Sequence, residues 1–359
     1  MKEKVTIVLF LSIIYGFFLF NFIMKDEELS FEERRHLKQF PEITISTVLD
    51  GSAFKEFETY TLDQFPFRNT FRSLKANVEY SMFQKLDNNG IYIKDNKIFK
   101  MEYPLKETNI KLFTKKVNQI YDKYLQGMNV YYMVIPDKNY YVEDEHLKMD
   151  YENLYKLVRE NMKELSYIEV RDLLSLEHYY DTDTHWKQEK IIPVARRLEE
   201  TMIGNASNHQ YEFQEYKPFY GVYYGQAAIG GKGETLTYLI NEVISQAFVE
   251  NKTDLSFHEV YNLKELGKMD SYNVFLSGST PFITIQNEKN KSGRELVIFR
   301  DSFASSLTPL LIDSYSKITL IDLRYMGASK LEEVITFENQ DVLFLYSTMV
   351  INESVMLKD

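Results

Sequence analysis

The sequence predicts an α/β protein in which helices flank a parallel sheet, preceded by a transmembrane helix at the N-terminus. Three observations indicate this class. The chain starts with a long uncharged run, several later runs are continuously apolar, and amphipathic helical segments separate those runs. Short apolar runs are typical of strands buried on both faces, and strands that alternate with helices form parallel sheets covered on both sides. Such sheets bind ligands at the carboxyl ends of their strands.

The N-terminal run at 5–24 contains no charged residue and is long enough to cross a bilayer core of roughly 30 Å as a helix. Lys2 and Lys4 precede it and acidic residues follow at 26–28, which favours a cytoplasmic N-terminus and an extracytoplasmic remainder. A cleavable signal peptide is the alternative, but it would end in small residues, whereas this run ends in bulky ones. We therefore expect an uncleaved anchor and a single-pass protein of the cell membrane.

Hydrophobic periodicity places the elements that follow. Strands are expected at 130–135, 167–170, 295–299, 317–321 and 341–346, and a small hairpin at 91–99. Helices are expected within 63–83, 110–124, 154–165, 191–202 and 303–315. This order repeats the alternation of helix and strand in two parts of the chain.

The same pattern divides the chain into three parts. Residues 1–25 form the anchor, 26–104 a juxtamembrane region of short helices and a hairpin, and 105–359 the domain that contains the sheet. Residues at about 205–292 are rich in Gly, Tyr and Asn and interrupt the alternation, so we expect them to form an insertion at the site.

Composition excludes several functions. The net charge of −11 argues against nucleic acid, which favours basic surfaces. Because the chain has no cysteine, disulfides, thiolate nucleophiles and Cys-ligated metals are excluded. The chain has 27 Tyr and 25 Phe. Tyrosines suit sugars, since each ring offers an apolar face and a hydroxyl, but they equally suit an aromatic core.

Ser302 lies where the strand at 295–299 is expected to turn into the helix at 303–315. A serine on such a turn is exposed at the carboxyl edge of the sheet, and amides at the start of the helix can stabilise an oxyanion. The arrangement resembles a nucleophile elbow without the G-x-S-x-G pattern. The alternative is that Ser302 or Asp301 only caps the helix.

Asp183 and His185 are two residues apart, so in extended backbone their side chains leave the same face. A carboxylate beside imidazole holds the tautomer in which Nδ1 donates and Nε2 accepts a proton. Trp186 follows directly and could exclude water or form the floor of a sugar site. Of the six histidines, only His185 has such an acid and an aromatic residue beside it.

Two other interpretations of this segment remain open. Asp181 lies on the same face as Asp183 and His185, and carboxylate and imidazole ligands also suit Mn or Zn. No later segment supplies an obvious further ligand cluster, so we expect no metal. The segment could also be only a polar turn that leads into the next helix.

Five segments together carry a family resemblance: 63–68 (DQFPFR), 134–138 (VIPDK), 183–186 (DTHW), 300–303 (RDSF) and 321–325 (IDLRY). With them the chain resembles the DHHW family of low-GC Gram-positive bacteria, from the anchor to about Tyr346. That family is similar to the alginate O-acetylation proteins and has SGNH-hydrolase-like folds. Thr184 stands where the family name has its first histidine, and Ser277 where a glycine is commoner.

The resemblance implies a triad of Asp183, His185 and Ser302. It also implies positions near the oxyanion or the substrate for a further set of residues, which are Arg324, Tyr346, Gly278 and Trp186. Because serine acyl transfer needs no metal or organic cofactor, we expect none.

By the same resemblance, an extracytoplasmic domain would transfer acetyl groups to a cell-surface polysaccharide through an acyl-enzyme. The family further implies a membrane-bound O-acyltransferase as the partner that supplies acetyl groups across the bilayer. Two alternatives remain. One is a carbohydrate acetylesterase with the same triad, and the other is a non-catalytic glycan-binding or scaffold component of an envelope acetylation complex.

Overall fold

The computed structural model describes residues 2–143, 147–206 and 210–359, and the chain divides into two compact units. The smaller unit contains residues up to 89 together with 224–231. The larger unit contains 90–223 and 232–359. Every residue of the expected site belongs to the larger unit.

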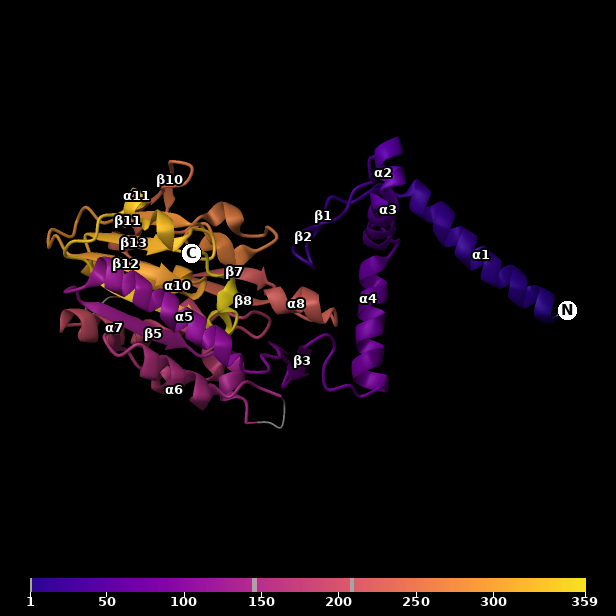
Figure 1. Ribbon diagram of the computed structural model, residues 1–359. Helices are drawn as coiled ribbons and strands as arrows, with labels where there is room; N and C mark the ends of the chain where they lie inside the picture. Colours follow the sequence, from indigo (N-terminus) through magenta and orange to yellow (C-terminus); the bar gives the residue numbers. More distant parts are fainter. Residues whose placement is uncertain (1, 144–146, 207–209) are drawn as a thin grey trace. The chain divides into compact units, whose positions relative to one another are not determined.

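The smaller unit begins with α1 (Lys2–Ile23), the one helix among the described residues that is long and apolar enough to span a membrane (Figure 1). None of its apolar stretch is buried, as expected for a helix surrounded by lipid, although signal sequences share this length and composition. The remaining elements are short: β1 (Leu29–Ser30), β2 (Arg35–His36), α2 (Ile45–Leu49), α3 (Ser52–Asp63) and α4 (Arg68–Asn77), which continues as a π-helix (Val78–Met82).

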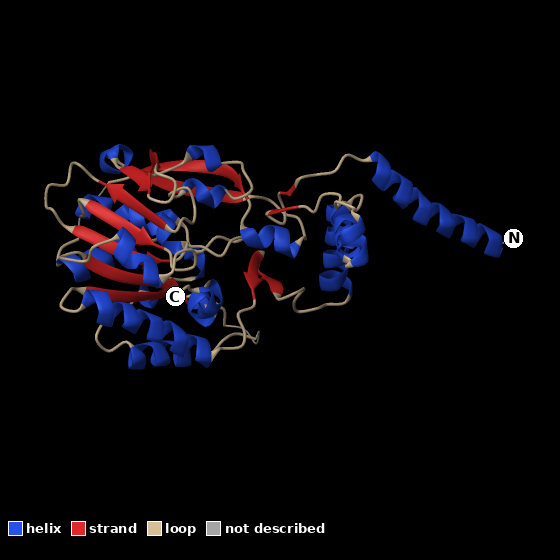
Figure 2. Ribbon diagram, turned by 45° about the horizontal axis from the view of Figure 1, so that its top comes forward, coloured by secondary structure: helices blue, strands red, loops and turns tan. Residues whose placement is uncertain are grey.

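The larger unit is built on a mixed sheet, with eight strands in its described part (Figure 2). Their order is β10 (Ser256–Glu259), β9 (Phe248–Asn251), β11 (Phe282–Gln286), β13 (Lys317–Ile321), β12 (Glu295–Arg300), β14 (Asp341–Ser347), β5 (Val130–Ile135) and β6 (Ser166–Tyr167). The strands from β13 to β6 pair in parallel, and β11, β9 and β10 extend the sheet by antiparallel pairing.

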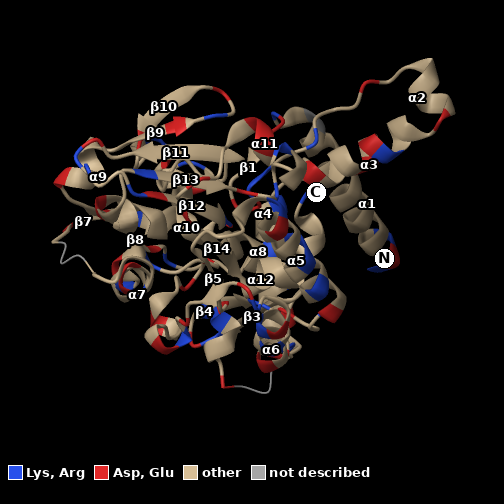
Figure 3. Ribbon diagram, turned by 60° about the vertical axis from the view of Figure 1, so that its left-hand side comes forward, with Lys and Arg blue, Asp and Glu red and all other residues tan. Residues whose placement is uncertain are grey.

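Helices cover both faces of this sheet. One face packs against α5 (Glu107–Ile120), α6 (Tyr151–Asn161) and α12 (Thr348–Asn352), and the other against α7 (Ile192–Ile203) and α10 (Phe303–Leu307). The larger unit also contains two hairpins, β3 (Ile91–Lys94) with β4 (Lys97–Lys100) and β7 (Glu212–Phe219) with β8 (Glu234–Ile240). Its other α-helices are α9 (Glu242–Gln246) and α11 (Leu331–Val334), while α8 (Val222–Ala227) begins in this unit and has residues 224–227 in the smaller one. Figure 3 shows charged residues of both signs on the helices and loops.

Strand β12 shows why the central strands are apolar throughout. Leu296 and Ile298 point into the core under α7 and α10, whereas Val297 and Phe299 point into the core under α5 and α6. Successive side chains of a strand leave opposite faces, and here each face is covered by helices. The predicted fold class is therefore confirmed.

The differences from the expected elements have local causes. The strand expected at 167–170 pairs only at Ser166–Tyr167, on the edge of the sheet. The helix expected at 303–315 is α-helical only to Leu307 and continues as a 3₁₀-helix with Pro309 near its start, where proline has no amide to donate.

The segment at about 205–292 does more than interrupt the alternation. Its described part supplies the antiparallel strands β9, β10 and β11 as well as the hairpin of β7 and β8, and only residues 207–209 lie outside the described part. The strands of this segment pair antiparallel and are separated by short helices such as α8 and α9, which are too short to show a helical period, so the helix–strand pattern disappears here.

The packing of Phe299 generates a stability prediction. Its buried ring stacks on Phe344 of the neighbouring strand, with ring centroids 4.6 Å apart. Phe299→Ala should lower the free energy of unfolding by about 3–5 kcal/mol, because it leaves a cavity in the core. Denaturant unfolding in detergent measures this loss. Phe213→Ala, at an exposed phenylalanine of β7, is the control and should change stability by less than about 0.5 kcal/mol. Equal losses in both variants would contradict the assigned core.

Candidate active site

Ser302 occupies the turn between β12 and α10. The carboxylate of Asp301 fixes this turn: its Oδ1 accepts from the amide of Phe303 at 3.0 Å, and its Oδ2 accepts from the amide of Ser347 at 2.7 Å. Ser347 ends the neighbouring strand β14, so Asp301 ties two strands and the helix together. Ser302 is thereby held, half-buried, at the carboxyl edge of the sheet.

His185 connects Asp183 to Ser302 by two hydrogen bonds. Its Nδ1 lies 2.6 Å from Asp183 Oδ1, and its Nε2 lies 2.8 Å from Ser302 Oγ. An ionised carboxylate only accepts hydrogen bonds, so Nδ1 donates to Asp183 and the lone pair of Nε2 faces the Ser302 hydroxyl. The amides of His185 and Val222 also donate to the buried Asp183 carboxylate, at 3.0 and 2.7 Å. The structure thus brings the three expected residues together.

Glu234 holds the loop that leads to Asp183. Its carboxylate accepts from the amides of Asp181 and Thr182, both at 2.8 Å, and from the Thr182 hydroxyl at 2.5 Å. Burial raises the pKa of Glu234, while these three donors act against that rise. Nothing in the local pattern indicates this role, since Glu234 follows a glycine-rich stretch that shows no recognisable motif.

Lys138 holds the same loop from the side of β5. Its buried Nζ donates to the carbonyl oxygens of Tyr180 at 3.1 Å and Asp181 at 3.2 Å. The ammonium also lies over the rings of Phe99 and Tyr223, 5.0 and 5.1 Å from their centroids. A usable signal was present, because Lys138 ends the segment 134–138 and lies three residues after a buried strand, at the edge where such sheets place their sites.

Aromatic side chains enclose the imidazole. The ring of Tyr272 stacks on that of His185 with centroids 3.8 Å apart and planes 8° apart. Trp186 is fully buried, and its indole donates to Ser306 Oγ at 2.9 Å, as does the Tyr272 hydroxyl at 2.8 Å. Trp186 therefore supports α10 and presents no face to a sugar. Sequence reasoning missed Tyr272, which nothing distinguishes from the other tyrosines.

Gly278 lies beside the nucleophile turn with its amide already engaged. The amide donates to the carbonyl of Phe275 at 3.1 Å, and its own carbonyl accepts from the buried Arg300 guanidinium at 3.3 Å. Its φ of +84° and the approach of Asn273 leave no room for a side chain: an added Cβ would lie 2.4 Å from Asn273 Oδ1. Gly278 is thus placed to shape the turn rather than to donate to a substrate.

Arg324 and Tyr346 differ in accessibility. The Arg324 guanidinium donates two hydrogen bonds to the Asp322 carboxylate, at 2.9 and 2.6 Å. Its Nη2 also lies 3.5 Å from Ser279 Oγ. Tyr346 is fully buried under α5, where its ring meets that of Phe113 edge-on. Its hydroxyl has no hydrogen-bond partner among the described residues. Arg324 therefore lies at the carboxyl edge, and Tyr346 lies inside the core.

Asp181 is turned away from the imidazole. Its carboxylate forms an ion pair with Lys97 of β4, so it does not converge with Asp183 and His185. Within the part of the chain that the structure describes, no three His, Asp or Glu side chains form a group that could hold a metal ion. The geometry favours the hydrogen-bonded triad over the metal interpretation.

Comparison with known proteins identifies the fold. No protein-family model matches the chain, and no curated protein matches it in sequence. A DHHW family protein from Eubacterium siraeum matches in structure with a TM-score of 0.64 at 19% identity, over 76% of this chain and 97% of that one. Bacillus cereus PatB1 matches with a TM-score of 0.59 at 18% identity, over 76% and 98% of the two chains. A PatB1 structure with a sulfonyl adduct also gives 0.59, at 16% identity over 75% and 100%. The expected resemblance to the DHHW family is confirmed at the level of the fold.

The buried ammonium of Lys138 generates a pH prediction. Burial lowers its pKa to about 7, against the attraction of Asp183 and Glu234. In the unfolded chain a lysine titrates near 10.4, so between about pH 7 and pH 10 the folded chain binds fewer protons than the unfolded chain. Stability should therefore rise with pH across this window.

Lys138→Met removes this titration and isolates its effect. Relative to the variant, the wild type should gain unfolding free energy as the pH rises from about 7 to about 9.5. Thermal unfolding in detergent at several pH values measures the difference. A difference that stays constant, or that falls with rising pH, would contradict the burial of a titrating Lys138.

Proposed function

We propose that this chain is a membrane-anchored member of the DHHW family that transfers O-acetyl groups to a cell-surface polysaccharide. The observation that carries the proposal is the hydrogen-bonded series from Asp183 through His185 to Ser302 at the carboxyl edge of the sheet. In this arrangement Ser302 is the nucleophile, His185 the base and then the acid, and Asp183 the group that orients the imidazole.

The first half-reaction forms the acyl-enzyme. Ser302 Oγ attacks the acetyl carbonyl of the donor while His185 Nε2 takes the hydroxyl proton. When the tetrahedral intermediate collapses, the bond between the acetyl group and the donor oxygen breaks. His185 returns the proton to that oxygen, which leaves acetyl-Ser302.

The second half-reaction transfers the acetyl group to the sugar. A sugar hydroxyl gives its proton to His185 and attacks the carbonyl of acetyl-Ser302. The ester bond to Oγ then breaks, and the proton moves from His185 to Oγ, which regenerates the enzyme. Neither step needs a metal or an organic cofactor.

The amide of Ser302 is the donor that we assign to the oxyanion. Among the first amides of α10, that of Phe303 donates to the Asp301 carboxylate and that of Ala304 donates to the Asp301 carbonyl. The amide of Ser302 precedes them at the same turn and has no acceptor among the described residues, so we assign it to the negative charge that develops on the carbonyl oxygen.

The compartment follows from α1. Lys2 and Lys4 at its start and acidic residues after its end favour an extracytoplasmic catalytic unit, where the surface polysaccharide lies. Acetyl groups must then cross the bilayer. We propose a membrane-bound O-acyltransferase as the partner that delivers them, and the family resemblance supports this assignment.

Substitution of the nucleophile tests the triad. Ser302→Ala should lower turnover of a chromogenic acetate ester by on the order of 10⁴-fold while the protein stays folded, because the acyl-enzyme can no longer form. Ser279→Ala, at an exposed serine of the same edge, is the matched control and should retain activity. Ser302→Ala activity within tenfold of wild type would rule out the nucleophile, and a wild type inactive on every acetyl donor would favour the scaffold alternative. Release of free acetate without an acetylated glycan would identify an esterase.

A pair of aspartate variants separates the triad from a metal centre. Asp183→Asn should lower turnover by on the order of 10³- to 10⁴-fold, because an amide favours the wrong imidazole tautomer. Asp181→Asn should have a mild effect, since Asp181 pairs with Lys97. A chelator should leave wild-type activity unchanged. Chelator-sensitive activity, with equal losses in the two variants, would overturn the triad.

A further inference from the structure

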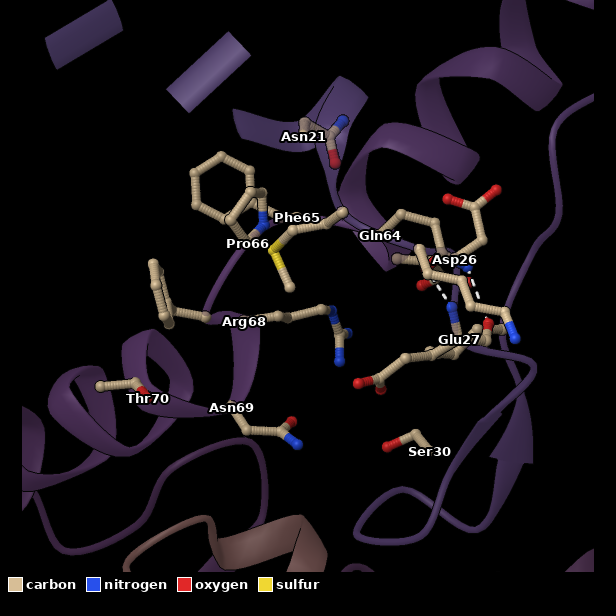
Figure 4. Close-up of a pocket in the computed structure, with 15 residues that line it drawn as sticks. Asn21, Asp26, Glu27, Ser30, Gln64, Phe65, Pro66, Arg68, Asn69 and Thr70 are labelled. Atoms are coloured by element: carbon tan, nitrogen blue, oxygen red, sulfur yellow. Dashed lines mark hydrogen bonds between the residues drawn. The ribbon is translucent and has the colours of Figure 1, made fainter. Parts of the chain in front are cut away.

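The segment at 63–68 (DQFPFR) lies in the smaller unit, where the proposed reaction leaves it without a role. Its polar members tie the chain that follows α1 to the junction between α3 and α4. Gln64 exchanges two hydrogen bonds with the backbone of Glu27, at 2.9 and 3.0 Å (Figure 4). Asp63 accepts from the amide of Lys38 at 2.9 Å and from the Arg35 guanidinium.

The Arg35 guanidinium lowers the pKa of Asp63, so this pair stays charged at neutral pH. Arg68 completes the connection through an ion pair with Glu33. A pocket of about 220 Å³ lies next to these groups, and Asn21 and Lys25, at the end of α1, help to line it. Figure 4 shows the guanidinium of Arg68 directed into this pocket. The polar residues Asp63, Gln64 and Arg68 thus lie close to the C-terminal end of α1.

Helix α4 exposes its apolar side to the surroundings and turns its charged side toward the rest of the smaller unit. Phe67, Phe71 and Leu74 form a stripe at the spacing i, i+4, i+7, and they are 56%, 42% and 58% exposed. On the other side, Arg68 and Arg72 turn inward to Glu33. A helix of a soluble unit buries its apolar stripe, so this reversed arrangement indicates that something other than water covers the stripe.

Contacts with α1 show what covers it. The ring of Phe17 lies 5.5 Å from that of Phe65 and 5.8 Å from that of Phe71, and the ring of Phe20 lies 5.6 Å from that of Phe67. The stripe is therefore continuous with the apolar surface of the helix that would span the membrane. Even with these contacts to α1, the rings of Phe67 and Phe71 remain about half exposed.

The position of these contacts along α1 sets their depth. Phe17 and Phe20 precede Met24, the end of the apolar run, by seven and four residues, which is roughly 10 and 6 Å of helix. In a spanning α1, both rings lie within the acyl-chain region near the outer boundary. Interfacial amphipathic helices bury their apolar faces to a similar depth of about 5–10 Å.

We propose that Phe65, Phe67, Phe71 and Leu74 insert into the outer leaflet beside α1, as a lipid-binding surface. The polar residues of the 63–68 segment hold this surface at the depth that the anchor sets. The inference rests on the spanning α1 of the proposed function, but not on its chemistry.

Depth measurement in lipid tests the proposal directly. Because the natural chain has no cysteine, single-cysteine variants of the full-length protein can carry one NBD fluorophore each. Leu74→Cys places the probe on the stripe. Asn69→Cys is the matched control: it is also exposed on α4, but lies about 140° around the helix. Both are reconstituted into phosphatidylcholine–phosphatidylglycerol vesicles with nitroxides on either the acyl chains or the headgroups, and thermal unfolding confirms that both stay folded.

Acyl-chain nitroxides should quench the probe at residue 74 several-fold more than the probe at residue 69. Equal access of a water-soluble quencher to both probes would overturn it. Shielding of residue 74 in native membranes, but not in vesicles of lipid alone, would also overturn it and would identify a protein partner instead. Acetate-ester turnover in the same vesicles reports the proposed function separately, so the two can fail independently.

Discussion

The site depends on holding one polar loop, residues 180–185, against the carboxyl edge of the sheet. Ser302 is fixed by its own strand and helix, but His185 reaches it from 117 residues earlier in the chain, across a hydrogen bond of 2.8 Å. Backbone groups of this loop find their partners in Lys138 on one side and Glu234 on the other. Without these partners, buried amides and carbonyls would be left unsatisfied and the imidazole would lose its position.

Holding the 180–185 loop in this way places several charged side chains inside the protein. Lys138, Asp183 and Glu234 are buried or nearly so, and each is offset by hydrogen bonds and by the opposite charge of its neighbours. Removing one member of such a group costs more than the group contributes as a whole, since the remaining charges stay buried. The arrangement favours a single loop conformation, which a hydrogen-bonded triad requires.

Local patterns in the sequence predicted much of this structure. The apolar run 130–135 was recognisable because a strand buried on both faces is apolar throughout. The turn from strand to helix at Ser302 was recognisable because an apolar run stops there and a helical pattern begins. The spacing of Asp183 and His185 also indicated that they meet, although the chain bends over 181–185 instead of running extended as expected. Tyr272 and Glu234 were not recognisable, because their roles come from contacts between segments distant in sequence. The antiparallel edge strands were also missed, since they are short and are joined by loops and 3₁₀ turns rather than by amphipathic helices.

The proposed triad mechanism requires that Ser302 becomes acetylated during turnover. The most direct measurement is mass spectrometry of the full-length protein after brief incubation with an activated acetate ester and an acid quench. We expect the mass of one acetyl group on the peptide that contains Ser302, and an unmodified peptide in His185→Ala, where no base takes the hydroxyl proton. An acetyl group on another residue, or turnover without any acetylated intermediate, would contradict it.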